Sequence, residues 1–327
     1  MPITCIRNEK GAALILVVLI VSIIVAVTME LNASSRANIY EAANFRDRVK
    51  TLYIAKSGFN AAGAMLLRDN NNYDSLNEIW SRTEVLSPYS AQLFDGEGHC
   101  VLIIEDESGR IPVHKIVNGR AYNEQYRDIL ARFLSLPEFD LDKEQVESII
   151  ASIKDWLDSD EDVSARGAES QYYQTLSQPY KAKNGALDSL DELLLVKGIT
   201  PEIFFGADGK PGIRDFLTVY GDGQININTA PKLVLRALSA DMTAERADAI
   251  DNYRRDPANT LSDLKWYTKV DSMSGVALAE NLISVKSRNF RISSTGILSS
   301  MRETVSGVIE RDIDGKRLKV LFWKTGS

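Results

Sequence analysis

Histidine and cysteine are scarce in this sequence, with only two of each among its 327 residues. His99 and His114 are the only imidazoles, and they lie 15 positions apart on expected strands. The sequence has no Gly-x-Ser-x-Gly elbow, Walker loop, dinucleotide fingerprint or His-Glu-x-x-His. Because a catalytic triad would need one of these two histidines, we predict no catalytic residues. A membrane-anchored hydrolase stays as a disfavoured alternative.

The sequence also gives no support for a disulfide or for a basic surface. Cys5 precedes a long apolar run and Cys100 follows it, so a membrane-crossing run would put them in different compartments. We predict no intramolecular disulfide, and a buried or half-buried Cys100 thiol in a strand. The formal net charge of -7 disfavours a general nucleic-acid binder, which needs a basic face against phosphate.

The apolar run covers residues 12–29, interrupted only by Ser22 and Thr28. At about 18 residues it is close to the minimum length of a membrane-spanning helix. Arg7 and Lys10 precede it, which predicts a cytoplasmic amino terminus and an outward-facing remainder. A secretory signal peptide is disfavoured because no small-residue cleavage site follows the run. A generic signal anchor is the second alternative.

A third interpretation depends on the residues Lys10-Gly11-Ala12. A short charged leader that ends in glycine before an apolar helix resembles the prepilin leader of type IV pilins and pseudopilins. The resemblance implies that a membrane-bound prepilin peptidase cuts after Gly11 and methylates Ala12, the new amino terminus. A glycine at the cut lets the peptidase approach the backbone closely.

One position departs from the usual pattern of that family. Most members carry Glu as the fifth mature residue, where this sequence has Leu16. A carboxylate inside a bilayer is costly without a partner, which in the family is thought to be the terminal amine of a neighbouring subunit. In lacking this Glu, the sequence resembles the K-type minor pseudopilins, which resemble a filament cap.

The fold class expected is α+β, with a long pilin-like amino-terminal helix packed on an antiparallel sheet. Apolar residues recur at spacings of three and four after Met29, which predicts one helix of about 55 residues from Ala12 to about Leu67. A hinge at Gly58 or Gly63 is the alternative. Strands are expected at 93–94, 100–105, 111–116, 290–297, 301–311 and 316–323, with a hairpin turn at 314–315.

Residues 118–284 are expected to form a large inserted all-α domain. Its predicted helices are 126–134, 143–157, 187–196, 231–238, 244–255, 261–270 and 275–282. Residues 187–196 and 261–270 are similar in sequence and form a weak internal repeat. Residues 225–254 resemble a helix-hairpin-helix or SAM-like module. Such modules often bind DNA, so a membrane-tethered DNA-uptake protein is the alternative function. The hairpin Ser239–Thr243 has an acid and no glycine, which argues against phosphate binding.

Together, the leader and the paired helical segments resemble the minor pseudopilins of the type II secretion system, in the general secretion pathway protein K family. The resemblance implies that the protein lies at the tip of the pseudopilus. It also implies that the I-type and J-type minor pseudopilins and the major pseudopilin are its partners. The head would lie in the periplasm and be anchored in the inner membrane. The expected divisions are a leader (1–11), a transmembrane part (12–29), helix and first strands (30–117), insertion (118–284) and last strands (285–327).

An acidic cluster follows the expected helix 143–157. Asp155 and Asp158 share a helix face, and Asp158, Asp160 and Asp162 alternate in the way that a loop surrounds a hard cation with oxygens. Glu169 follows after the conformationally free Gly167. The family has calcium-binding heads, so these five acids are predicted as ligands of a structural Ca²⁺. A solvated acidic surface is the alternative.

Overall fold

The computed structural model describes residues 9–83, 90–94, 96–312 and 317–326. Most of the predicted leader, including Cys5 and Arg7, lies outside these residues, as does the predicted 314–315 turn. The α-helices are α1 (Glu9–Arg68), α3 (Glu124–Leu134), α4 (Lys143–Leu157), α5 (Ser170–Tyr173), α6 (Pro201–Phe205), α7 (Lys232–Ala237) and α8 (Ala244–Arg255). The strands are β1 (His99–Asp106), β2 (Ile111–Pro112), β3 (Val117–Asn118), β4 (Ala121–Tyr122), β5 (Leu217–Thr218), β6 (Ile225–Asn226), β7 (Ile283–Ser284), β8 (Asn289–Leu298), β9 (Met301–Asp312) and β10 (Arg317–Gly326).

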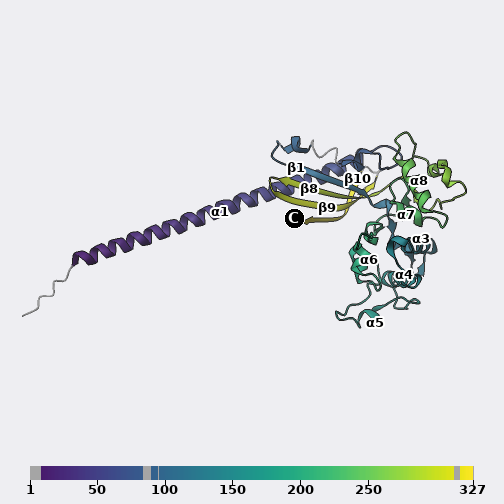
Figure 1. Cartoon of the computed structure of the whole chain (residues 1–327), viewed down its shortest axis with the longest axis horizontal. Helices are drawn as coiled ribbons and strands as arrows, with labels where there is room; N and C mark the ends of the chain where they lie inside the picture. Colours follow the sequence, from purple (N-terminus) through teal and green to yellow (C-terminus); the bar gives the residue numbers. More distant parts are fainter. Residues whose placement is uncertain (1–8, 84–89, 95, 313–316, 327) are drawn as a thin grey trace, which may run out of the picture.

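The longest element is α1, a single continuous helix without the alternative hinge (Figure 1). Its amino-terminal part stands free of the rest of the chain, and its carboxy-terminal part packs on β1, β8 and β9. Glycines permit this close approach. A Cβ at Gly58 would lie 2.3 Å from Ser294 Oγ, and one at Gly296 would lie 2.2 Å from the carbonyl of Thr51. The predicted long helix is therefore present, and its glycines serve helix–sheet packing.

The main sheet is antiparallel, in the order β1-β8-β9-β10. One face buries apolar side chains against α1, among them Ile54, Phe59 and Leu66 on the helix. Cys100 lies in this core as a buried thiol, as predicted. We call α1 from Thr51 onward together with this sheet the sheet body.

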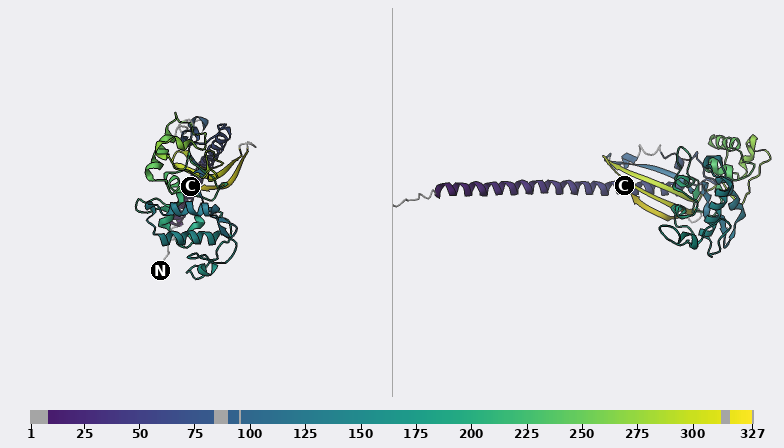
Figure 2. Two further views of the ribbon diagram at one scale, coloured as in Figure 1. Left: turned by 90° about the vertical axis from the view of Figure 1, so that its right-hand side faces the viewer. Right: turned by 60° about the horizontal axis from the view of Figure 1, so that its bottom comes forward.

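The chain between β1 and β8, residues 107–288, forms what we call the inserted segment. It lies beyond the carboxy-terminal end of α1 and projects to one side of the helix axis (Figure 2). Its own apolar core is separate from that of the sheet body and includes Ile111, Val113 and Ile116. The insertion thus begins just after Asp106, earlier than the expected boundary at 118.

The inserted segment holds six of the α-helices, α3 to α8, but it is not all-α, because it also holds three two-stranded sheets, β2-β5, β3-β4 and β6-β7. The predicted helices at 187–196 and 261–270 are short 3₁₀ turns, at 190–195 and 266–269. Residues 275–282 form no helix, because Gly275 has a φ of +77° and the Leu278 amide donates to the Tyr267 hydroxyl.

Two of the predicted strands are also shorter or absent. The expected strand 111–116 is limited to β2 and then becomes a 3₁₀ turn, since Pro112 has no amide to donate to a ladder. Residues 93–94 lie in a 3₁₀ turn. The strands expected at 100–105, 290–297, 301–311 and 316–323 are confirmed, with small shifts of their ends.

Candidate functional site

The free part of α1 is an uncovered apolar rod. Large apolar side chains from Leu14 to Leu31 are exposed along it. The two polar residues of the apolar run 12–29 bond inside the helix, since Ser22 Oγ donates to the Val18 carbonyl at 2.8 Å and Thr28 Oγ1 to the Ile24 carbonyl at 2.7 Å. Among the described residues, α1 alone is long and apolar enough to cross a membrane. The run 12–29 therefore has no polar side chain without a hydrogen bond to oppose insertion in lipid.

An apolar stripe continues on α1 beyond the predicted membrane segment. Leu31, Ile39, Phe45 and Tyr53 are all exposed. At 100° per residue these four side chains fall within a sector of about 120°. Tyr40 is also exposed but lies outside this sector. The described residues of the head leave the four side chains of the stripe uncovered.

The acidic cluster is built at the end of α4. A capping box between Asp142 and Gln145 starts this helix, and its apolar face anchors it in the insertion core. Asp158 follows the last residue of α4, and the loop after it brings Glu169 back to the helix end. One carboxylate oxygen from each of Asp158, Asp160 and Glu169 lies within 4.8 Å of the others.

Two buried acids of this cluster, Asp158 and Glu169, have oxygens without a partner among the described residues. Both carboxylate oxygens of Glu169 and Oδ1 of Asp158 are buried and accept no hydrogen bond from the described residues. Burial and the carboxylates of Asp155, Asp158, Glu161 and Asp160, in that order, raise the pKa of Glu169 to about 8. Buried anionic oxygens without donors are the arrangement expected of a cation site. The donor set therefore fits Ca²⁺, which prefers carboxylate oxygens in flexible geometry.

Two cations of the protein already lie near the cluster. Lys154 Nζ is 2.5 Å from Asp158 Oδ2 and 3.6 Å from Asp155 Oδ1. Arg120 Nε is 3.3 Å from Asp160 Oδ2. These ion pairs occupy one side of the acids and leave the Glu169 carboxylate uncompensated.

The other predicted ligands lie at different places. The buried Asp155 carboxylate accepts the Ser164 amide, at 3.1 Å for Oδ2. A Cβ at Gly167 would lie 2.0 Å from that same oxygen, which explains the glycine. Asp162 is exposed and lies outside the group of three acids, although its amide donates to Asp160 Oδ1 at 2.9 Å.

Sequence reasoning did not identify Asn184 as a neighbour of this cluster. Asn184 Nδ2 donates to the Asp160 carbonyl at 2.7 Å and to Glu161 Oε1 at 3.1 Å, and its Oδ1 is buried without a partner. Asn184 also has a φ of +48°, which an asparagine tolerates better than most residues. An Asn-Gly pair between two helical segments is the only sequence signal for this turn.

The helix-hairpin-helix resemblance corresponds to internal contacts. Asn228 Oδ1 accepts the indole N–H of Trp266 at 2.6 Å, and Asn228 Nδ2 donates to the Leu261 carbonyl at 3.2 Å. Arg254 is buried and donates to Asp251 and to the Ile227 carbonyl. The polar residues of this segment therefore hold the fold together, which gives the DNA-uptake alternative no support.

The two histidines lie in structural positions. His99 begins β1, and His114 Nε2 contacts the Gly221 carbonyl at 3.2 Å. Burial lowers the pKa of His114, with Lys115 adding to the effect. Its environment thus favours a neutral ring.

Comparison with known proteins gives one consistent family. Residues 109–205 and 225–286 match two family models described as "Type II secretion system (T2SS), protein K". The type II secretion system protein K of Pseudomonas aeruginosa is 28% identical over 325 residues, which cover 95% of this chain and 91% of that protein. The protein K of Pectobacterium carotovorum is 24% identical over 297 residues, covering 86% of this chain and 87% of that protein.

The fold is also similar to a solved structure. It matches a chain in the crystal structure of the GspK-GspI-GspJ complex from the enterotoxigenic Escherichia coli type 2 secretion system. The TM-score is 0.68 at 17% sequence identity, and the match covers 88% of this chain and 99% of that one. With an uncovered apolar helix, an antiparallel sheet and family matches on both halves of the insertion, this chain belongs to the type II secretion system protein K family and is a minor pseudopilin.

Proposed function

We propose that this minor pseudopilin forms the tip of the pseudopilus, together with the I-type and J-type minor pseudopilins, and helps to initiate assembly for the export of folded proteins. The observation that carries the proposal is the apolar stripe of Leu31, Ile39, Phe45 and Tyr53, which the described part of the chain leaves exposed. Apolar helix surface of this kind is stabilised by packing against other helices. The partner helices would come from the other pseudopilins, including the major one.

Two features favour the tip over the filament shaft. Leu16 provides no carboxylate for the terminal amine of a subunit placed above it. The inserted segment lies beyond the end of α1 and to one side of it (Figures 1 and 2), where a subunit stacked above would meet it. A subunit of this shape ends a filament more easily than it continues one.

Anchoring and processing complete the proposal. The helix spans the inner membrane once, with the sheet body and inserted segment in the periplasm. Prepilin peptidase removes the leader after Gly11, and Ala12 becomes the methylated terminus. Gly11 lies in the first turn of α1, where a Cβ placed on it would meet nothing within 4 Å. The protein itself performs no chemical reaction in this account.

A photo-crosslinking experiment tests the helix contact. A photoreactive amino acid replaces Ile39 in the stripe or, as matched control, the exposed Ala37 on the other side of α1. We expect adducts with I-type or J-type pseudopilins from position 39 at a yield several times that from position 37. Equal yields at both positions, or no adduct at position 39 in an assembled system, would contradict the assignment.

The inserted segment is best interpreted as two repeats of helix-hairpin-helix or SAM-like kind. In each, a long helix is followed by a short 3₁₀ turn, namely α4 with residues 190–195 and α8 with residues 266–269. The first copy contains the additional loop that carries the acidic cluster. The repeats serve as scaffold for that loop.

The cluster itself is a structural calcium site. Asp158, Asp160 and Glu169 would hold the ion, with Asp155 and the Asn184 amide alongside. Hard oxygen donors suit Ca²⁺, and the flexible loop suits its irregular coordination. The ion would order the loop between α4 and the 190–195 turn, which no disulfide secures.

Calorimetric titration of the full chain in detergent with CaCl₂ tests this site. We expect saturable binding that Glu169→Gln or Asp158→Asn weakens at least tenfold. Asp162→Asn removes an equal charge outside the group of three acids and should change the affinity much less. Equal weakening by all three variants would indicate a diffuse acidic surface instead of a site.

A further inference from the structure

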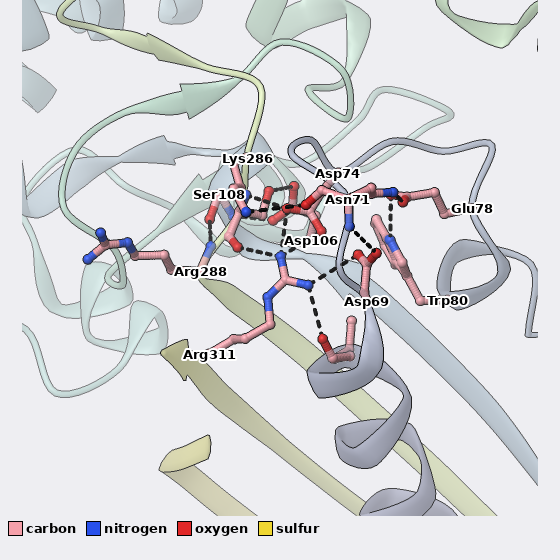
Figure 3. Close-up of polar contacts among 12 residues, drawn as sticks. Asp69, Asn71, Asp74, Glu78, Trp80, Asp106, Ser108, Lys286, Arg288 and Arg311 are labelled. Carbon is pink, nitrogen blue, oxygen red and sulfur yellow. Dashed lines mark hydrogen bonds and ion pairs between the residues drawn. The ribbon is translucent and has the colours of Figure 1, made fainter. Parts of the chain in front are cut away.

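The inserted segment is joined to the sheet body by two stretches of chain that lie side by side (Figure 3). One leaves β1 at Asp106, and the other returns through Ser287 to β8. They are bonded to each other, because Ser287 Oγ donates to Asp106 Oδ2, and Ser108 Oγ accepts the amides of Arg288 and Asn289 at 3.3 and 3.4 Å. Two parallel connectors of this kind act as a hinge unless other contacts fix them.

The guanidinium of Arg311, on β9, lies at this hinge and is almost completely buried. Its Nη1 donates to the Leu66 carbonyl at 3.1 Å and to Asp69 Oδ2 at 3.3 Å, at the end of α1. Its Nη2 donates to both oxygens of Asp74 at 2.6 Å and to the Ser287 carbonyl at 2.8 Å (Figure 3). One planar fork thus ties together α1, the loop after it, β9 and the returning connector.

The same network reaches into the inserted segment. Asn226 Nδ2, on β6, donates to the Asp74 carbonyl at 3.1 Å and to Asp106 Oδ2 at 3.2 Å. Thr229 Oγ1 donates to the same Asp106 oxygen at 2.6 Å. The Asp106 carboxylate therefore collects donors from both connectors and from the insertion itself.

A second buried group joins the two parts close by. The Glu107 carboxylate is fully buried and accepts Arg291 Nε of β8 at 2.6 Å, Arg110 Nη1 at 2.9 Å and Thr218 Oγ1 of β5 at 2.6 Å. β8 belongs to the sheet body and β5 to the insertion. Arginines on both β8 and β9 of the sheet body therefore form hydrogen bonds at the junction with the inserted segment.

The apolar cores do not perform this joining. Among the described residues, the core of the sheet body and that of the inserted segment form two separate clusters. Burying charged groups at a boundary costs free energy that apolar residues of similar volume would not. What a directional polar network supplies in return is one defined geometry.

We propose that Arg311, Asp74 and Asp106 form an interdomain lock that fixes the direction in which the inserted segment projects from the end of α1. The lock makes the head one rigid unit, and its loss leaves both parts folded but able to turn about the two connectors. Asn226, Thr229 and Ser287 carry the lock into the insertion.

Variants can weaken the lock without creating large packing defects. Thr229→Val is nearly isosteric and Ser287→Ala removes one oxygen, and the pair deletes two of the donors to Asp106. Arg311→Lys keeps the charge but cannot form all the bonds of the planar fork. Arg288→Gln is the matched control, because Arg288 lies on the same connector with an exposed side chain and only a 4.0 Å contact to Asp222.

Electron–electron spin distances in the full-length chain in detergent test the lock. Cys5 is replaced by Ser, and labels are attached at the exposed positions Ile103 of β1 and Phe205 of α6 in the insertion, each changed to Cys. We expect a narrow distance distribution for the parent and for Arg288→Gln. The Thr229→Val/Ser287→Ala pair should broaden it about twofold, since hinge motion follows the loss of fixed contacts.

Circular dichroism decides which variants are interpretable. If Arg311→Lys fails to fold, the double variant alone decides the outcome. A double variant that keeps native circular dichroism and a distribution as narrow as the parent's would overturn the proposal. A broadened distribution in Arg288→Gln as well would also overturn it, because the motion would then not depend on the buried network.

Discussion

Replacing Glu169 by Gln should change the stability of the head in opposite directions with and without calcium. In the metal-free protein, the Glu169 carboxylate faces Asp158 and Asp160 at oxygen separations within 4.8 Å and has no donor among the described residues. Removing its charge relieves repulsion. With Ca²⁺ present, the same change removes a ligand.

The size of the effect follows from the distances. Two unit charges 4.8 Å apart repel by about 3.5 kcal/mol at an effective dielectric constant of about 20, and Glu169 meets two such charges. Lys154 and Arg120 neutralise part of this field. We therefore expect Glu169→Gln to raise the metal-free unfolding free energy by about 1–3 kcal/mol when Glu169 is ionised. Saturating Ca²⁺ should stabilise the parent by about 2.7 kcal/mol at a hundredfold excess over Kd, and the variant far less.

The pH dependence has a definite sign. The pKa of Glu169 is raised to about 8 from an ordinary 4.5, so the folded metal-free protein keeps a proton that the unfolded chain has lost. Stability from this group is therefore lost as pH rises from about 4.5 to about 8. The advantage of the variant in EDTA should be small at pH 5 and largest near pH 9.

Denaturant unfolding of the full chain in detergent, in EDTA and in CaCl₂ at both pH values, measures these differences. Asp162→Asn serves as the control because it removes one exposed charge outside the group of three acids. If Glu169→Gln is less stable than the parent in EDTA at pH 9, the assigned repulsion is wrong. If calcium stabilises both proteins equally, the assigned ligand is wrong.

Two further substitutions test how the fold is held. Gly296→Val should destabilise the head by about 3 kcal/mol, since a Cβ there would lie 2.2 Å from the Thr51 carbonyl, a backbone atom that cannot rotate away. Gly326→Val, which meets nothing within 4 Å, is its control, and equal thermal midpoints for the two would refute the close approach. Asn228→Ala should cost about 1–3 kcal/mol by denaturant unfolding, because it leaves the buried Trp266 N–H without an acceptor. A loss below 0.5 kcal/mol, the usual limit for surface substitutions, would contradict that role.

Local patterns were enough to predict the elements that depend on periodicity. The helix from Ala12 onward and the strands β1, β8, β9 and β10 follow from spacings of three to four or of two, and these are close to the observed bounds. The expected helix 261–270 was wrong because irregular turns bury Leu261, Tyr267 and Val270 and pack Leu264 against the same core. Their spacing of three imitates that of a helix. Periodicity records burial, and it does not distinguish a helix from turns that bury the same positions.

The candidate sites also differ in how much of them the sequence could predict. The proximity of Asp158, Asp160 and Glu169 was predictable because the acids are near in sequence and a glycine-containing loop separates them, whereas their role as ligands stays a prediction. Asn184 was not, since its place beside them depends on how the loop closes. Arg311 was invisible to sequence reasoning, because its partner Asp74 lies 237 positions away and the pair meets only through the completed fold.

The central claim is that α1 persists after the leader is removed and serves as both membrane anchor and assembly surface. Intact-mass and peptide spectrometry of the full chain, produced together with a prepilin peptidase, tests it most directly. The account predicts a mature terminus at Ala12 with an added methyl group, and retention of the leader in a Gly11→Leu variant. A mature chain that begins beyond Met29 and diffuses freely in the periplasm would contradict it.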